Sequence, residues 1–132
     1  MNVTGEGRNG GRVQSDDGLL TTALALPKEL DGTGDATNPE QLFAAGWGAC
    51  FLGALCLVAA QRKVKLTSTA INTEITLVHS EAGFSLAAVL NVELGGVGQD
   101  TATVLTKAAH QTCPYSKATR GNIPVTINTT AV

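Results

Sequence analysis

The chain has 132 residues, of which 43% are hydrophobic and 15% are charged, a balance that excludes a disordered polyelectrolyte and predicts one domain over residues 1–132. Its net charge of -2 provides no electrostatic attraction to nucleic acid or to anionic lipid. Phe, Trp and Tyr make up only 4% of the chain, so an aromatic surface for stacking bases is not expected.

The N-terminal residues and the cysteine count predict the compartment. Residues 1–5 are polar and contain no apolar secretory segment. Three cysteines form an odd set, which makes a framework of structural disulfides improbable. We therefore expect a cytoplasmic protein, in which cysteines are reactive, metal-binding or simply part of the core.

The first third of the chain is rich in glycine and polar residues. Asn9-Gly10 predicts a hairpin turn, and residues 16–18 predict a second turn that leads into a strand over 19–26. Residues 28–37 are predicted to form a loop. By itself, Arg8 in such a segment is most simply an exposed loop cation.

A long helix is predicted over residues 38–62. Asn38 suits the N-cap, Pro39 suits the first helical position, and Gln41 can complete a capping box with Asn38. Residues 42–60 carry no charge, so the helix is apolar on every side, which indicates a buried helix.

The same uncharged run must be tested as a membrane span, because its 19 residues reach the usual length. Six of them are Ala, three Gly and two Cys, which keeps its hydrophobicity modest. The rest of the chain reads as a soluble α+β domain that needs a core. We therefore expect no membrane association.

The length of this helix predicts a dimer. About 25 helical residues extend over about 37 Å, whereas a compact chain of this size has a radius of gyration of about 14 Å. One sheet and one short helix can hardly cover an apolar helix that crosses the whole domain. A second subunit is expected to bury the remainder.

The C-terminal half predicts an antiparallel strand pair over 66–78 and 84–94, and a helix over 99–112 that ends at Cys113-Pro114. A last strand is expected over 123–130. Strands that are mostly antiparallel, combined with helices, define the α+β class.

Three cysteines could carry chemistry. Cys50 and Cys56, inside the apolar helix, are by default inert core thiols. Cys113 differs because it precedes Pro114 at a helix break, where backbone N–H groups would point at its sulfur and favour the thiolate. His110 and Cys113 have the spacing of metal ligands, but a structural zinc site needs four ligands and few candidates remain.

Two thiols and one guanidinium would form a different kind of site. A Cys50 thiolate held by Arg8 could attack a peroxide and become a sulfenic acid, with which a second thiol would condense. Glu40 could orient Arg8 through a bidentate pair. Because Glu40 and Cys50 lie about 15 Å apart along the helix axis, Glu40 is expected to come from the partner subunit.

Three stretches of the chain resemble a known family. Asn-Pro-Glu-Gln-Leu-Phe-Ala-Ala-Gly at 38–46, with Ala-Cys-Phe-Leu-Gly-Ala-Leu at 49–55, resembles the first signature of the organic hydroperoxide resistance (Ohr) proteins of the OsmC/Ohr superfamily. Residues 109–123, which include Cys-Pro-Tyr-Ser-Lys-Ala-Thr-Arg-Gly-Asn, resemble the second signature. Residues 7–10 resemble the family's early Gly-Arg-Asp-Gly segment, with Asn9 in place of Asp.

This resemblance implies an intertwined α+β homodimer with antiparallel sheets around a long buried central helix. It implies a thiol peroxidase for alkyl and fatty-acid hydroperoxides, with Cys50 as the peroxidatic and Cys113 as the resolving cysteine. Arg8 and Glu40 match the pair that activates the first thiol. The implied reductant is a dihydrolipoyl group on a lipoylated protein, and no metal or bound cofactor is implied.

The apolar residues near these positions become candidates for holding an alkyl chain, although each is individually more typical of a core residue. They are Leu42, Phe43, Trp47, Phe51 and Tyr115.

Two further departures from the family pattern are visible. Trp47 occupies a position where Tyr is common, and the short segment before Arg8 predicts a missing or truncated first strand. Two alternatives also stay open: a peroxidase of the OsmC branch with a broader substrate range, and a non-enzymatic thiol sensor or small-ligand binding protein on the same fold.

Overall fold

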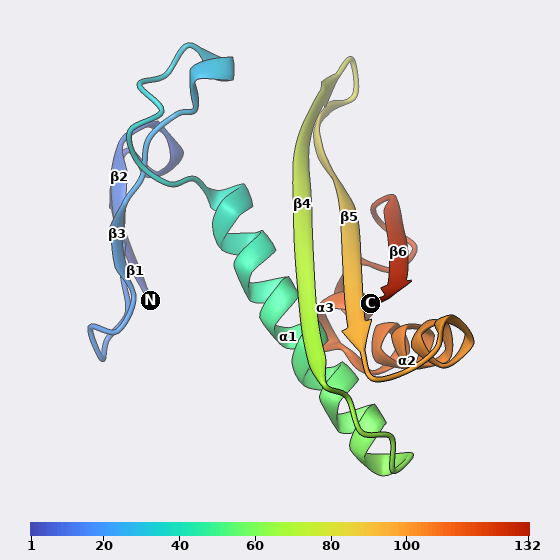
Figure 1. Ribbon diagram of the computed structural model, residues 1–132. Coiled ribbons are helices and arrows are strands. Elements are labelled where there is room, and N and C mark those ends of the chain that lie inside the picture. The colour runs from blue at the N-terminus through green and yellow to red at the C-terminus, as the bar shows by residue number, and fades with distance from the viewer. The chain divides into compact units, whose positions relative to one another are not determined.

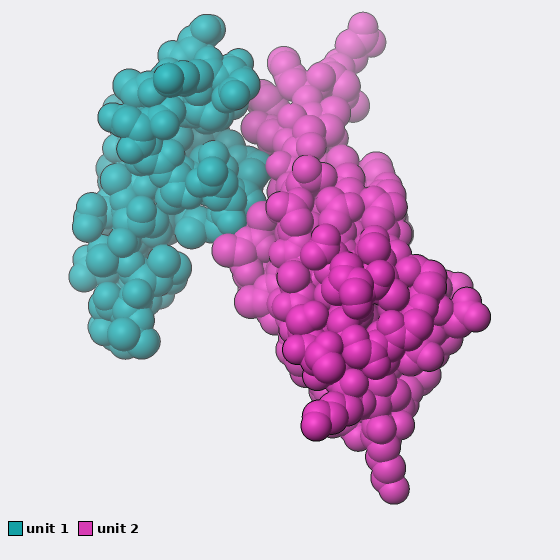
Figure 2. All heavy atoms as spheres, viewed as in Figure 1, with its two compact units in different colours: residues 1–43 teal, residues 44–132 magenta.

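The computed structural model describes residues 1–132 and divides them into two compact units, unit 1 over residues 1–43 and unit 2 over residues 44–132 (Figure 2). Each unit contains one three-stranded sheet (Figure 1). The boundary falls inside the long helix α1, Pro39–Gln61, whose first five residues belong to unit 1.

Unit 1 is built on a small antiparallel sheet with the strand order β1-β2-β3. Its strands are β1 Asn2–Gly5, β2 Gly11–Gln14 and β3 Thr21–Ala23, and its two short 3-10 helices are η1 Gly7–Asn9 and η2 Lys28–Leu30. The predicted hairpin before Arg12 and the turn after β2 are confirmed. The first strand is not missing, although it has only four residues, and β3 is shorter than the predicted strand.

Gly11 allows this hairpin to close tightly. A Cβ atom at Gly11 would lie 2.3 Å from the Thr4 carbonyl oxygen and 2.7 Å from the Gly7 backbone nitrogen, so no other residue fits without moving the backbone. The close approach holds η1, which carries Arg8, against β1 and β2.

Helix α1 begins as predicted at its N-cap but differs in one detail. The Gln41 backbone N–H donates to Asn38 Oδ1 at 2.9 Å, which confirms Asn38 as the cap. The predicted return contact of the capping box, from the Gln41 side chain to Asn38, is wrong, because Gln41 Oε1 accepts a hydrogen bond from the Thr37 hydroxyl instead. The helix ends at Gln61, and Lys63 adopts the left-handed conformation, with φ of 57°, that closes many helix C-termini.

One face of α1 is buried and the opposite face is exposed. The buried residues are Trp47, Gly48, Phe51, Ala54, Leu55, Val58 and Ala59. Between Leu42 and Ala60 the exposed positions are nevertheless small or apolar: Ala45, Ala49, Gly53, Cys56, Leu57 and Ala60. By length and composition α1 could cross a membrane, a test that the core helix of a soluble protein also passes.

Unit 2 contains a long antiparallel hairpin, β4 Ser68–Ser80 and β5 Gly83–Gly95, paired from Ser68 with Gly95 to Ser80 with Gly83 (Figure 1). The third strand, β6 Val125–Ala131, pairs in parallel with β5. The connection between them carries α2, Gln99–Thr112, and α3, Pro114–Thr119, because parallel neighbours need a long crossover. The predicted strand pair, the helix over 99–112 and the α+β class are confirmed.

The core of unit 2 lies between this sheet and the helices. Leu90, Val92 and Leu94 of β5 are almost completely buried, as are Leu105 of α2 and Leu55 of α1. The backbone of α1 lies close to β4, since a Cβ atom at Gly48 would lie 2.9 Å from Thr73 Oγ1. This packing fixes α1 and the α2–α3 junction within one unit.

Candidate functional site

Two of the three cysteines are in direct contact, and we call Cys50 and Cys113 the thiol pair. The Cys113 thiol donates a hydrogen bond to Cys50 Sγ, with 3.4 Å between the sulfur atoms. Cys50 is half-buried in α1, and Cys113 is fully buried between α2 and α3. A disulfide has an S–S length of about 2.05 Å, so an approach of about 1.4 Å would join the two sulfurs.

The break between α2 and α3 places Cys113. Its backbone is extended, with φ of -63° and ψ of 122°, as expected for a residue before proline, and Pro114 starts α3. The Cys113 side chain makes no capping hydrogen bond with α3. The Tyr115 backbone N–H bonds instead to Cys50. The prediction that amides of this turn point at the Cys113 sulfur is therefore wrong, since the Cys113 side chain makes no such hydrogen bond.

Within unit 2, the groups around Cys50 favour its neutral form. Burial and the hydrogen bond with Cys113 raise the pKa of the Cys50 thiol above its usual value, while the Tyr115 amide acts in the opposite direction. A nucleophilic thiol needs the reverse shift. Unit 2 by itself therefore supplies no positive charge that would favour the thiolate at Cys50.

Arg8 and Glu40 form a bidentate ion pair, which we call the ion pair. Arg8 Nη1 donates to Glu40 Oε2 at 2.8 Å, and Arg8 Nη2 donates to Glu40 Oε1 at 2.5 Å. The hydrogen bond to Glu40 raises the pKa of Arg8, and the hydrogen bond from Arg8 lowers the pKa of Glu40. Both groups are held in their charged forms.

The ion pair corrects one prediction. Glu40 was expected to reach Arg8 from a partner subunit, but the two residues pair within one chain and within unit 1. The helical distance between Glu40 and Cys50 was the reason for that expectation. The four predicted catalytic residues thus form two pairs, one in each unit.

The five apolar candidates are placed differently from one another. Trp47 and Phe51 have no exposed surface, so both belong to the core, as each was individually expected to, and their role in holding an alkyl chain stays a prediction. Tyr115 is 41% exposed, and Leu42 and Phe43 are half-buried. Cys56 is exposed, so its interpretation as a core thiol is also wrong.

Two contacts near the thiol pair were not predicted. The Trp47 indole Nε1–H donates to Ser116 Oγ at 3.2 Å, and the Arg120 guanidinium donates to the His110 carbonyl oxygen at 2.5 Å at the end of α2. Ser116 and Arg120 both lie in the signature at 109–123, which was the available signal. Their hydrogen-bond partners, Trp47 and His110, could not be predicted from spacing along the chain, because the tertiary structure brings them together.

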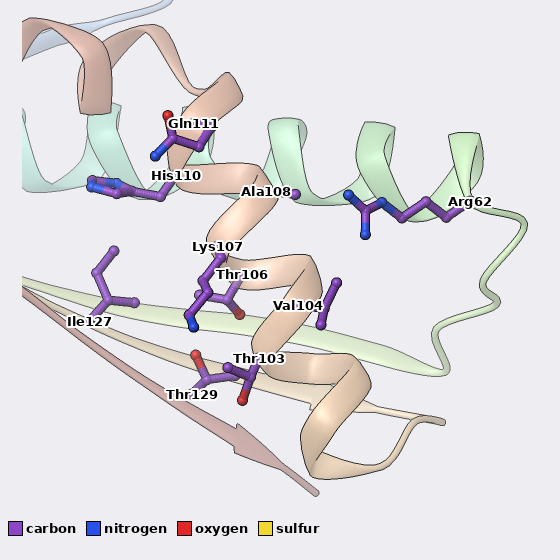
Figure 3. Close-up of a pocket in the computed structure, with 10 residues that line it drawn as sticks. All are labelled: Arg62, Thr103, Val104, Thr106, Lys107, Ala108, His110, Gln111, Ile127 and Thr129. Atoms are coloured by element: carbon purple, nitrogen blue, oxygen red, sulfur yellow. The ribbon is translucent and has the colours of Figure 1, made fainter.

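A surface cavity of 550 Å³ lies along α2, beside β6 and the end of α1 (Figure 3). Its charged lining residues are Arg62 and Lys107, and it contains none of the predicted catalytic residues. His110 also lines it, and burial lowers the pKa of this imidazole. No group of three His, Cys, Asp or Glu side chains is arranged to hold a metal ion, so the spacing of His110 and Cys113 is not extended into a metal site.

The fold and the thiol pair define a class: a small α+β protein with two cysteines close enough to form a disulfide after a small movement. Comparison with known proteins specifies it. A family model described as OsmC-like protein matches residues 32–128.

An organic hydroperoxide resistance protein of Xanthomonas axonopodis pv. citri is 45% identical over 127 residues, which cover 95% of this chain and 89% of that protein. The Bacillus subtilis organic hydroperoxide resistance protein OhrB is 42% identical over 125 residues, 93% of this chain and 91% of that one.

A solved structure agrees with these relatives. The crystal structure of an organic hydroperoxide resistance protein from Elizabethkingia anophelis matches with a TM-score of 0.93 and 42% identity, covering 99% of this chain and 94% of that one. The chain belongs to the Ohr branch of the OsmC/Ohr superfamily.

Proposed function

We propose that this protein is a cysteine-based peroxidase that reduces organic hydroperoxides to alcohols. The observation that carries the proposal is the 3.4 Å contact between Cys50 and Cys113 at the positions of the two family signatures. The relatives named for organic hydroperoxide resistance supply the substrate class. Alkyl and fatty-acid hydroperoxides are the proposed substrates, and the proposed compartment is the cytoplasm.

The proposed reaction has two steps at the thiol pair. The Cys50 thiolate attacks the distal oxygen of ROOH, the O–O bond breaks, and the alkoxide leaves and takes a proton as ROH, which makes Cys50 a sulfenic acid. The Cys113 sulfur then attacks Cys50 Sγ. An S–S bond forms, the S–O bond breaks, and water leaves with the proton of Cys113.

A dithiol would reopen the disulfide. Thiolate attack forms a mixed disulfide, and the second thiol of the reductant releases it, so that two electrons return to the protein. We propose a dihydrolipoyl group on a lipoylated protein as this dithiol. The chain's own residues then need no metal or bound cofactor.

Activation of Cys50 is assigned to the ion pair. No cation of unit 2 lowers the pKa of Cys50, which is raised, whereas Arg8 is a permanently charged group fixed by Glu40. A guanidinium beside Cys50 would lower its pKa and increase the fraction of thiolate. Because Glu40 precedes Cys50 by about 15 Å along one helix, we propose that the ion pair of one subunit serves the thiol of the other.

A homodimer is part of this proposal. The exposed face of α1 is apolar or small at every position named above, and Leu57 on it is 51% exposed. A second subunit packed on this face would remove that surface from water. Leu57→Glu should therefore shift the protein from dimer to monomer in size-exclusion chromatography with light scattering. A monomeric natural protein at micromolar concentration would contradict the dimer.

Steady-state turnover tests the function. The purified protein is mixed with cumene hydroperoxide or a fatty-acid hydroperoxide and dihydrolipoamide, and the alcohol is measured by chromatography. We expect many turnovers per subunit, and faster consumption of these substrates than of hydrogen peroxide. Oxidation of one equivalent without recycling would instead support a thiol sensor, and equal rates for all peroxides would favour the broader OsmC-branch activity.

A further inference from the structure

The contact between Trp47 and Ser116 lies beside the thiol pair and, like the thiol pair, connects α1 with the α2–α3 region. Trp47 precedes Cys50 by three residues on α1, and Ser116 follows Cys113 by three residues on α3. The indole–hydroxyl hydrogen bond therefore joins the same two segments as the sulfur–sulfur contact, one helical turn away on α1. Both side chains are fully buried.

We propose that the Trp47–Ser116 hydrogen bond is a positioning device that holds α3 against α1 and thereby sets the distance between the two thiols. Trp47 and Ser116 are positioning residues in this proposal, because neither supplies an atom that reacts in the two steps.

The shortness of α3 makes such a connection necessary. A helix of six residues is not stable on its own, so α3 depends on tertiary contacts for its place. The other hydroxyl hydrogen bonds of its buried residues stay within the helix, since Thr119 Oγ1 donates to the Tyr115 and Ser116 carbonyl oxygens. The Ser116 hydroxyl, in contrast, reaches a residue 69 positions earlier in the chain.

The chemistry is sensitive to this placement. Closing the disulfide requires the sulfurs to approach by about 1.4 Å from their present distance with the correct dihedral geometry. A displacement of about 1 Å can change the rate of such a reaction about 100-fold. Loss of the hydrogen bond should therefore slow the attack of Cys113 on the Cys50 sulfenic acid more than it slows the attack of Cys50 on the peroxide.

The test compares Ser116→Ala and Trp47→Phe with Thr119→Val. The first two remove one partner of the hydrogen bond, while the third removes a buried hydroxyl whose bonds stay inside α3. After one equivalent of cumene hydroperoxide, peroxide loss reports the first step, and dimedone trapping of the sulfenic acid with mass spectrometry reports the second. The rate readout rests on the proposed peroxidase function.

We expect Ser116→Ala to leave the first step within about twofold and to slow disulfide closure about tenfold, with more overoxidation of Cys50. Thr119→Val should close the disulfide at the natural rate. The double variant should be no slower than the slower single one, because both changes break one interaction. Equal slowing in Thr119→Val, or unchanged closure in Ser116→Ala, would overturn the proposal.

An equilibrium measurement separates this proposal from the proposed function. The Cys50–Cys113 disulfide is titrated in dithiothreitol redox buffers, with no peroxide present. We expect Ser116→Ala to disfavour the disulfide about tenfold, which is about 30 mV for a two-electron couple. If the natural protein consumes no peroxide but Ser116→Ala still shows this shift, the peroxidase function is refuted and the positioning role stands. An unchanged potential would refute the positioning role.

Discussion

The ion pair of unit 1 and the thiol pair of unit 2 differ in charge and in burial. Arg8 and Glu40 are held in their charged forms by two hydrogen bonds, and the Arg8 side chain is still 33% exposed. Cys113 has no exposed surface, and burial favours the neutral form of Cys50, which is half-buried. Arg8 and Glu40 supply a cation but no nucleophile. Cys50 and Cys113 supply nucleophilic sulfur atoms, but unit 2 supplies no cation to activate them. We therefore propose that reactivity requires both pairs.

The largest effect is expected at the thiol pair itself. Cys50→Ser should abolish peroxide consumption, since the hydroxyl cannot replace the thiolate as nucleophile. The matched control is Cys56→Ser, which changes the exposed thiol six residues along the same helix and should leave turnover nearly intact. Alcohol formation under steady-state conditions measures both, and similar losses in the two variants would remove Cys50 from its assigned role.

The next effect tests whether the ion pair supplies the missing charge. Arg8→Ala should raise the pKa of Cys50 and lower its alkylation rate at pH 7 about tenfold, because one pKa unit corresponds to a tenfold change in thiolate. Iodoacetamide labelling between pH 5 and 10, in a Cys56→Ser background and followed by peptide mass spectrometry, measures this pKa.

Arg12→Ala is the control for this substitution. Arg12 lies in the same unit, and its guanidinium donates to the exposed Thr21 hydroxyl. Its loss should leave the labelling profile unchanged. If the profiles of Arg8→Ala and the natural protein coincide, the ion pair does not activate Cys50.

The smallest effect concerns the stability that the ion pair contributes. The pKa of folded Glu40 is lowered by Arg8, so its stabilisation is present above the unfolded value of about 4.5 and is lost as the pH falls through the folded value. Glu40→Gln should reduce the free energy of unfolding by about 1 kcal/mol at pH 7.

Urea titrations at one protein concentration, at pH 7 and at pH 3, measure this difference. The gap between Glu40→Gln and the natural protein should narrow at the lower pH. Glu29→Gln, which changes an exposed carboxylate of the same unit, serves as the control. A gap that stays constant with pH would show that the carboxylate charge is not the cause.

Much of unit 2 could be predicted from the sequence, because its signals are local. Alternating apolar residues predicted β4 and β5, and the bounds of α2 follow from the glycines before it and Pro114 after it. The parallel pairing of β6 with β5 could not be predicted in this way, since a strand's own pattern does not specify its neighbour.

The candidate site was predictable as a set of residues and not as a set of contacts. The two signatures gave Cys50, Cys113 and Glu40, the segment at 7–10 gave Arg8, and the capping pattern gave Asn38. Which groups meet depended on competition among partners: the side chain of Gln41 bonds to Thr37 instead of Asn38, and Arg8 meets Glu40 in its own chain. The partner of each side chain depends on the tertiary structure, which cannot be read from the spacing of residues along the chain.

The unequal burial of the two sulfurs determines how the oxidised protein would be reopened. Cys113 has no exposed surface, whereas Cys50 is half-buried, so we expect an incoming thiolate to attack the Cys50 sulfur. The mixed disulfide would therefore form on Cys50, with Cys113 as the leaving group. Reduction would then retrace the route of oxidation, because substrate and reductant would both arrive at the same sulfur and could not occupy it together.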